Sequence, residues 1–194
     1  MPSEFLDRVY AATDAEGRLP LPDQAMWEIF PFQPDHLVVK PLDAPEFPEP
    51  ARHGEHGGQC DPCTNPDAGA VWSNANWILT SLGPTGLPFA AMLQPRAHLD
   101  LDELDDDLAA ELGILTVRIT RAATELPDVA RVHVNKWGDG AKHLHVFFLG
   151  RPAGLQQLRG SNLALWEEML PRVPEAESAA ALRHVAAHAD GIAA

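Results

Sequence analysis

Two short motifs combine side chains that bind metals or attack electrophilic centres. Cys60 and Cys63 form a Cys-x-x-Cys motif, and His143 and His145 form a His-x-His motif. Two thiolates at the first spacing match half of a tetrahedral zinc site. Because the chain has no other cysteine, two further ligands must be His or carboxylate. The candidates are His98 and one member of the His143/His145 pair.

A redox-active dithiol is the alternative interpretation of the cysteine pair. A thioredoxin-like motif places its cysteines at the start of a helix that follows a strand. Pro62, Pro66 and the Gly-rich approach from His53 instead predict a loop, which favours zinc. His53 and His56 flank this loop and are reserve ligands.

The His-x-His motif lies in an apolar segment, 143–149, that is predicted to be a strand. Side chains alternate between the two faces of a strand, so His143, His145 and Phe147 should share one face. Two histidines on a strand are equally compatible with a structural role. A neutral imidazole, with an ordinary pKa of about 6.5, is also a good nucleophile and forms a labile bond to phosphorus.

The elements that must position these residues follow from the apolar pattern. The segment 101–126 has apolar side chains at spacings of three and four, which predicts one long helix. Its first turn is acidic, as the helix dipole favours. Strands are predicted over 70–72, 77–82, 89–94, 129–134 and 143–149, and shorter helices over 163–170 and 176–188. We therefore expect an α+β fold, with an antiparallel sheet and the long helix packed on one face.

Three regions are expected along the chain. Residues 1–59 are rich in proline between short apolar runs, which predicts an N-terminal extension. Residues 60–152 contain the motifs and all of the predicted strands and form the expected domain. Residues 153–194 form a C-terminal helical segment. In it, His184 and His188 are four residues apart on a helix but lack the Glu of the zincin motif, which favours a surface helix face.

Composition limits the classes of partner. The chain has 14 basic and 28 acidic residues among 194 and a formal net charge of −14, which disfavours binding to a nucleic-acid backbone. No apolar segment reaches the roughly 18 residues of a membrane span, and no N-terminal signal pattern is found. These features predict a cytoplasmic protein, and they still allow a small anionic ligand in a local pocket.

The order of the motifs resembles the histidine-triad (HIT) superfamily over about residues 60–152. The shared order is Cys-x-x-Cys, Pro-Arg-x-His, a helix with an acidic start, Val-Asn, a Gly-rich turn and His-x-His. The resemblance extends to its zinc-bearing members and its galactose-1-phosphate uridylyltransferase branch. It implies that His145 is the nucleophile, and that Cys60, Cys63, His98 and His143 hold a structural zinc ion. It also implies a homodimer.

Further substrate contacts are expected around the nucleophile. Asn135 would orient or hydrogen-bond the phosphate, and Lys142 is a charge partner for it. Trp77 is the tryptophan favoured for stacking on a base. Phe147 stands where the superfamily has a third His or a Gln, and a phenyl ring cannot donate a hydrogen bond to phosphate.

Two functions follow from the resemblance. The first is a nucleotide phosphohydrolase or nucleotidyltransferase that acts at the α-phosphate through a His-nucleotidyl intermediate on His145. The alternative, motivated by Phe147, is a catalytically silent, zinc-containing protein that binds a nucleotide or a partner.

Overall fold

The chain divides into two compact units, Met1–Pro50 and Ala51–Ala194. The computed structural model describes residues 11–190 except 29, 42 and 58. The second unit begins before the predicted boundary at residue 60, because the backbone of His53 pairs with that of Ala141. It also includes the C-terminal helices.

The described part of the first unit, within 11–50, is irregular. It contains two short 3-10 turns, Asp23–Met26 and Pro34–His36. Large apolar side chains such as Trp27, Val38 and Phe47 are exposed. The described part of this unit therefore has little regular secondary structure.

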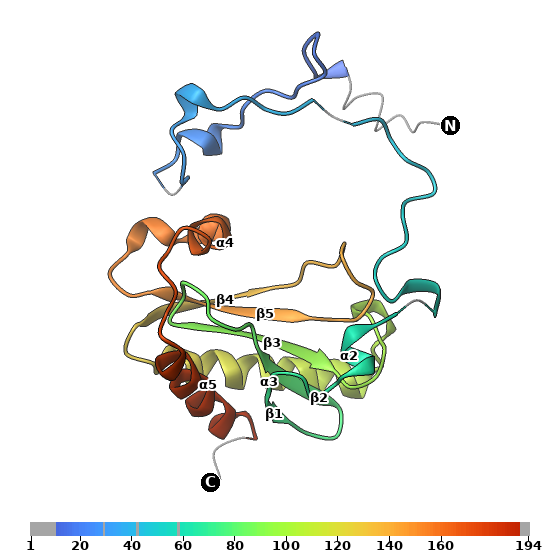
Figure 1. The fold of residues 1–194 in the computed structure, drawn as a ribbon, viewed down its shortest axis with the longest axis vertical. Helices are drawn as coiled ribbons and strands as arrows, with labels where there is room; N and C mark the ends of the chain where they lie inside the picture. Colours follow the sequence, from blue (N-terminus) through green and yellow to red (C-terminus); the bar gives the residue numbers. More distant parts are fainter. Residues whose placement is uncertain (1–10, 29, 42, 58, 191–194) are drawn as a thin grey trace. The chain divides into compact units, whose positions relative to one another are not determined.

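The second unit contains a five-stranded antiparallel sheet with helices on both faces (Figure 1). The strand order is β1-β2-β3-β5-β4. The long helix α3 and the C-terminal helix α5 cover one face, and the short helix α4 lies over the other. The elements are β1 (Ala70–Ser73), β2 (Trp77–Ser81), β3 (Phe89–Pro95), α3 (Asp106–Thr124), β4 (Val129–Asn135), β5 (Val146–Pro152), α4 (Leu163–Glu167) and α5 (Glu175–Ala189). The predicted α+β class and antiparallel sheet are confirmed.

Alternation along the strands divides the core into two layers. Leu93 and Phe148 point toward the helices and pack in one cluster with Ile119 of α3 and Val185 of α5. Apolar residues of the opposite parity form a second cluster on the α4 side, which includes Leu149. The central strands β3 and β5 are therefore buried on both faces, which gives the site a rigid support.

The long helix is shorter than the predicted range 101–126. Asp105 caps it, accepting a hydrogen bond from the Leu108 N–H at 2.8 Å. The preceding turn, Leu101–Glu103, is a separate 3-10 helix with Asp100 as its cap, and Leu104 is extended between the two. Asp100 and Asp105 thus cap two successive helices where the sequence predicted a single one.

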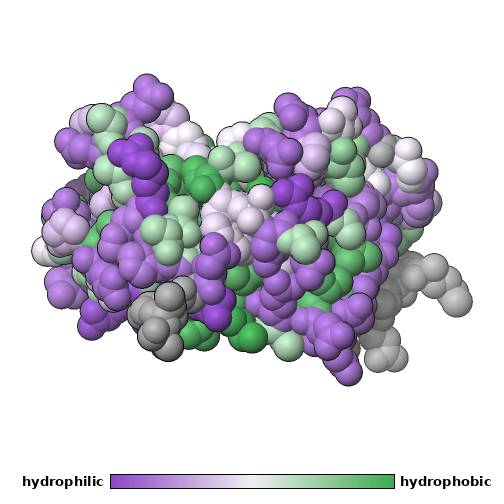
Figure 2. All heavy atoms as spheres, turned by 90° about the horizontal axis from the view of Figure 1, so that it is seen from below, coloured by the Kyte–Doolittle hydropathy of each residue, from purple (hydrophilic) through white to green (hydrophobic). Residues whose placement is uncertain are grey.

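The surface shown in Figure 2 is covered mainly by hydrophilic side chains, with apolar residues visible in smaller areas between them. This agrees with the strongly acidic composition. Among the described residues, no helix combines the length and the apolar character that crossing a bilayer requires.

Candidate functional site

The cysteine pair lies at the start of a short helix, α2 (Asp61–Thr64), and not on a loop as the sequence predicted. Cys60 is its N-cap residue. Pro62 is accommodated because the first turn of a helix has no use for its missing N–H. The helix has only four residues, which is far below the length at which a helix is stable alone. Other contacts must therefore hold it.

The structure brings the four expected metal ligands together. The Cys60 and Cys63 sulfur atoms lie 3.3 and 3.5 Å from Nδ1 of His143, and the Cys63 sulfur lies 3.4 Å from Nδ1 of His98. All four ligand atoms are within 4.8 Å of one another. Zinc bonds of about 2.3 Å to sulfur and 2.0–2.1 Å to nitrogen would separate such atoms by about 3.5 Å in a tetrahedron. The four residues therefore fit a zinc ion.

The ring of His143 is oriented for metal binding by a backbone carbonyl. Its Nε2–H donates to the carbonyl oxygen of Pro95 at 2.9 Å, which leaves the lone pair of Nδ1 directed at the cysteines. Burial lowers the pKa of His143 and outweighs the opposing effect of this hydrogen bond. The neutral imidazole, which is the metal-binding form, is thereby favoured.

The thiol of Cys63 resists ionisation when no cation is near. Burial of its sulfur, followed by the hydrogen bond and charge of Cys60, raises the pKa of Cys63 to about 11, although the residue as a whole is exposed. A raised pKa opposes a reactive dithiol, which needs a thiolate. A bound cation would reverse this effect by stabilising both thiolates.

His145 presents a free ring nitrogen beside the metal-ligand cluster. Its Nδ1–H donates to the backbone oxygen of His143 at 2.7 Å. This fixes the tautomer and leaves the lone pair on Nε2, which has no hydrogen-bond partner among the described residues. Strand β5 begins at Val146, after the predicted start at residue 143, because His143 turns toward the cysteines and the Leu144 N–H donates to Leu99 O. His145 thus stands where the strand begins.

Aromatic rings flank His145, and they are not the ones that the sequence indicated. Its ring centroid lies 5.3 Å from that of Phe147, which in turn lies 5.2 Å from that of Trp137. Trp137 is 48% exposed. Trp77 was expected to stack on a base, but it is fully buried in the core and donates from Nε1 to Glu111, so its ring offers no face to a ligand. Trp137 is the exposed ring of this group, and Phe147 lies between it and His145.

Of the other two predicted substrate contacts, Asn135 lies on the His145 face of the sheet, whereas Lys142 is in an ion pair. Asn135 ends β4 directly opposite Phe147 in the sheet register, so the two share the His145 face. Lys142 directs its amine to Glu103 at 2.8 Å. Its positive charge is therefore already compensated.

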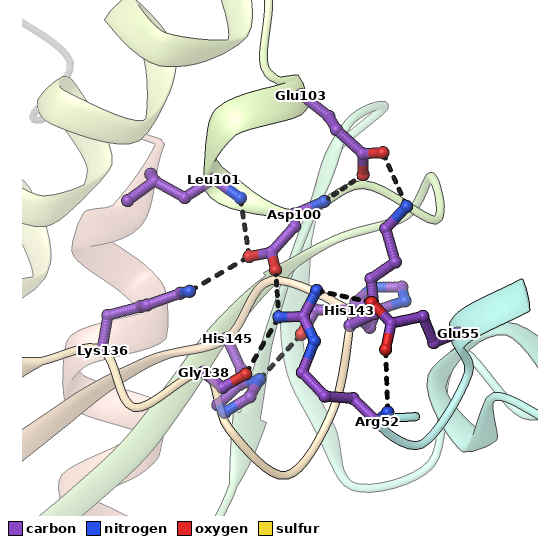
Figure 3. A network of polar contacts seen from close by, with 10 residues as sticks. Arg52, Glu55, Asp100, Leu101, Glu103, Lys136, Gly138, His143 and His145 are labelled. Atoms are coloured by element: carbon purple, nitrogen blue, oxygen red, sulfur yellow. Dashed lines mark hydrogen bonds and ion pairs between the residues drawn. The ribbon is translucent and has the colours of Figure 1, made fainter. Parts of the chain in front are cut away.

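A network around Asp100 holds the turn between Asn135 and His143, and sequence spacing did not identify it (Figure 3). Arg52 donates to the Asp100 carboxylate at 2.7 Å and to the backbone oxygen of Gly138 at 3.0 Å. Lys136 contacts the other carboxylate oxygen of Asp100 at 3.1 Å. Arg52 is 48 residues and Lys136 is 36 residues from Asp100 in the sequence. Because these separations follow no local period, only the folded chain brings the three residues together.

The buried amide of Gln94 is a second feature that the sequence did not indicate. Gln94 is 4% exposed, and its Oε1 has no hydrogen-bond partner among the described residues. It follows Leu93, the register partner of Val146, and shares its sheet face with Met92, the partner of Phe147. The unpaired acceptor is therefore on the His145 face, level with the start of β5.

Comparison of the sequence with models of protein families and with curated proteins finds no match. The fold, however, is similar to solved structures. A histidine triad protein from Marinobacter aquaeolei matches with a TM-score of 0.50 and 18% identity, over 61% of this chain and 88% of that one.

Two further structures are similar at lower scores. A zinc-bound histidine triad family protein from Mycobacterium smegmatis has a TM-score of 0.49 at 21% identity, over 68% of this chain and 95% of that one. A uridylyltransferase mutant has 0.42 at 24%, over 69% and 48%. The similarity to the Marinobacter protein establishes the architecture. The chain has the α+β fold of the histidine triad proteins.

Proposed function

We propose that this protein is a nucleotide phosphohydrolase or nucleotidyltransferase that acts at the α-phosphate through His145. The observation that carries the proposal is the fixed tautomer of His145, with Nδ1–H on the carbonyl of His143 and the lone pair on Nε2. The motif resemblance supplies the substrate class, and the fold agrees with it.

The reaction would proceed in two displacements. Nε2 of His145 attacks the α-phosphorus, the bond from phosphorus to the leaving group breaks, and a nucleotidyl-imidazole forms. Nδ1–H keeps its hydrogen bond to His143 O and spreads the developing positive charge. Water or an acceptor hydroxyl then attacks phosphorus and releases the imidazole. Asn135, opposite Phe147, would donate from its amide to a phosphate oxygen.

The zinc ion that the cluster fits has a structural role in this proposal. Cys60, Cys63, His98 and His143 would all bind it, which leaves no open position for a substrate. Bound zinc would hold the backbone of His143, whose carbonyl orients the nucleophile. The metal would thus affect catalysis only by positioning His143 and, through it, His145.

The experiment is turnover and labelling with a substrate panel. Adenosine and guanosine phosphoramidates, dinucleoside polyphosphates and nucleotide sugars are incubated with the wild type, with His145→Ala and with His36→Ala, an exposed histidine of the first unit, as the matched control. We expect turnover and an acid-labile label in the wild type and the control, and neither in His145→Ala. Turnover that survives in His145→Ala refutes the proposal.

A silent binding protein is the second candidate, and Phe147 favours it. Its ring contacts His145 and Trp137 where the superfamily pattern has a hydrogen-bonding side chain. This candidate predicts nucleotide binding by calorimetry without product from any member of the panel. Robust turnover by the wild type eliminates it.

A further inference from the structure

A second group of metal-binding side chains lies between α3 and α5, which pack on the same face of the sheet (Figure 1). Glu125 follows the last turn of α3 as its C-cap residue, and His184 and His188 lie on α5. The potential ligand atoms of the three residues are all within 4.8 Å of one another. The glutamate comes from 59 residues away, so the histidine spacing alone could not reveal it.

The two histidines present nitrogen atoms on one side of their helix. Residues four apart share a helix face, and the ring centroids of His184 and His188 are 4.7 Å apart. Nδ1–H of His188 donates to the backbone oxygen of His184 at 2.7 Å. The lone pair of His188 is therefore on Nε2, and the ring is held in place from behind, as is usual for metal-binding imidazoles.

Nε2 of His184 is screened from solvent and has no hydrogen-bond partner among the described residues. Its nearest acidic atom is Oε2 of Glu125 at 3.5 Å. This distance exceeds the roughly 2.7–3.2 Å of an N–H···O hydrogen bond. It agrees with the edge of about 3.4 Å between N and O ligands bound at 2.0–2.2 Å to one tetrahedral ion.

We propose that Glu125, His184 and His188 form a second zinc site, with a fourth coordination position open to water or a small ligand. Two imidazoles and one carboxylate suit zinc and similar transition metals, whereas magnesium and calcium prefer oxygen ligands alone. His184 also lines a cavity of about 790 Å³ whose wall includes Leu126, Pro174 and Ala181. A small anion or water molecule could reach the metal from there.

The test is metal stoichiometry, and it does not depend on the proposed function. Wild type, His188→Gln, Glu125→Gln and the matched control His36→Gln are dialysed against the same buffered zinc, and bound zinc is counted per chain. We expect the first two variants to hold one zinc fewer than the wild type and the control, whatever the Cys60 cluster holds. Magnesium should not compete.

Calorimetric titration and a cobalt spectrum complete the test. Loss of a ligand should weaken this site by more than the roughly 10- to 100-fold that loss of a supporting hydrogen bond costs a metal site. Cobalt in a site without cysteine lacks the sulfur charge-transfer bands that Cys60 and Cys63 would produce, so the two sites are distinguishable. Because the side chain of Glu125 is more than half exposed, it can be replaced without loss of a buried contact. Equal zinc content in wild type, His188→Gln and Glu125→Gln overturns the proposal.

Discussion

Asp100 is a buried carboxylate that fixes the turn beside the proposed nucleophile. Its side chain is 6% exposed, and it accepts hydrogen bonds from the Leu101 N–H, Arg52 and Lys136. Burial opposes its ionisation, but these donors outweigh burial and lower the pKa from 3.8 to about 2. Because the folded pKa is depressed, the contribution to stability is complete above about pH 4 and is lost as pH falls through 2.

Replacement of Asp100 should therefore destabilise the protein in a pH-dependent way. We expect Asp100→Asn to lower the free energy of unfolding at pH 7 by roughly 2 kcal/mol, and the difference from the wild type to shrink between pH 4 and pH 2. Urea unfolding of both proteins across this range measures it, and other acid effects cancel in the difference. The neighbouring, exposed Asp102→Asn is the control. A difference that does not change with pH would contradict the assignment.

Under the proposed function, Trp137 is the aromatic side chain that would contact a base. It is half exposed and lies against Phe147, one ring away from His145. Stacking on one base contributes roughly 1–3 kcal/mol, so Trp137→Ala should weaken nucleotide binding by about 5- to 150-fold. Calorimetry with His145→Ala as the background keeps the ligand intact. Trp27→Ala, an equally exposed tryptophan of the first unit, should bind as the parent does.

At the scale of elements, the local sequence pattern predicted most of the sheet but few of the contacts around the site. The strands near residues 70, 77, 89 and 129 and the helices near 163 and 176 occur close to their predicted bounds, because alternation and helical spacing are local signals. The start of β5 and the cysteine helix differed, because contacts with His143 set both. The side chains that hold the turn, above all Arg52, contact residues far away in the sequence. No local period could therefore predict these contacts.

The cysteine helix α2 gives a prediction about metal removal. With four residues it has too few internal hydrogen bonds to persist, and the four-ligand cluster would join it to His98 and His143. A ligand that binds only the folded chain stabilises it by roughly 4 kcal/mol at 1,000 times its Kd. We expect a strong chelator to lower Tm by several degrees. Once α2 unravels, the burial that raises the pKa of Cys63 is lost, so both thiols should then react. Thermal unfolding and thiol titration measure this.

The control separates zinc from a general effect of the chelator. Cys63→Ser already lacks one ligand, so its Tm should start lower and respond little to the same chelator. If the wild type unfolds at the same temperature with and without chelator, and its thiols remain unreactive, the metal does not stabilise this region.

At the scale of the whole molecule, the sheet has an edge at β4, and exposed apolar residues lie on β4 and on α3, which packs against it. β4 pairs with β5 on one side, and Val134 on it is 41% exposed. Ile114 and Val117, one turn apart on the outward face of α3, are 51% and 55% exposed. An edge strand with one unpaired side and exposed apolar side chains are features that a second copy can cover. They fit the homodimer that the resemblance implies.

Association of two such chains must overcome their charge. Each copy has a formal net charge of −14, and repulsion between like charges is screened as ionic strength rises, with a Debye length of about 10 Å at 0.1 M salt. We therefore expect light scattering to give a mass near twice 21.1 kDa, with dimer dissociation at low protein concentration suppressed by added salt. Val134→Lys and Val117→Glu should shift the protein to the monomer, whereas Val38→Glu, an exposed valine of the first unit, should not. A wild-type mass of one chain at every concentration and salt level would rule out the dimer. If the dimer instead weakens as salt is added, contacts between charges, and not these apolar residues, hold the two copies together.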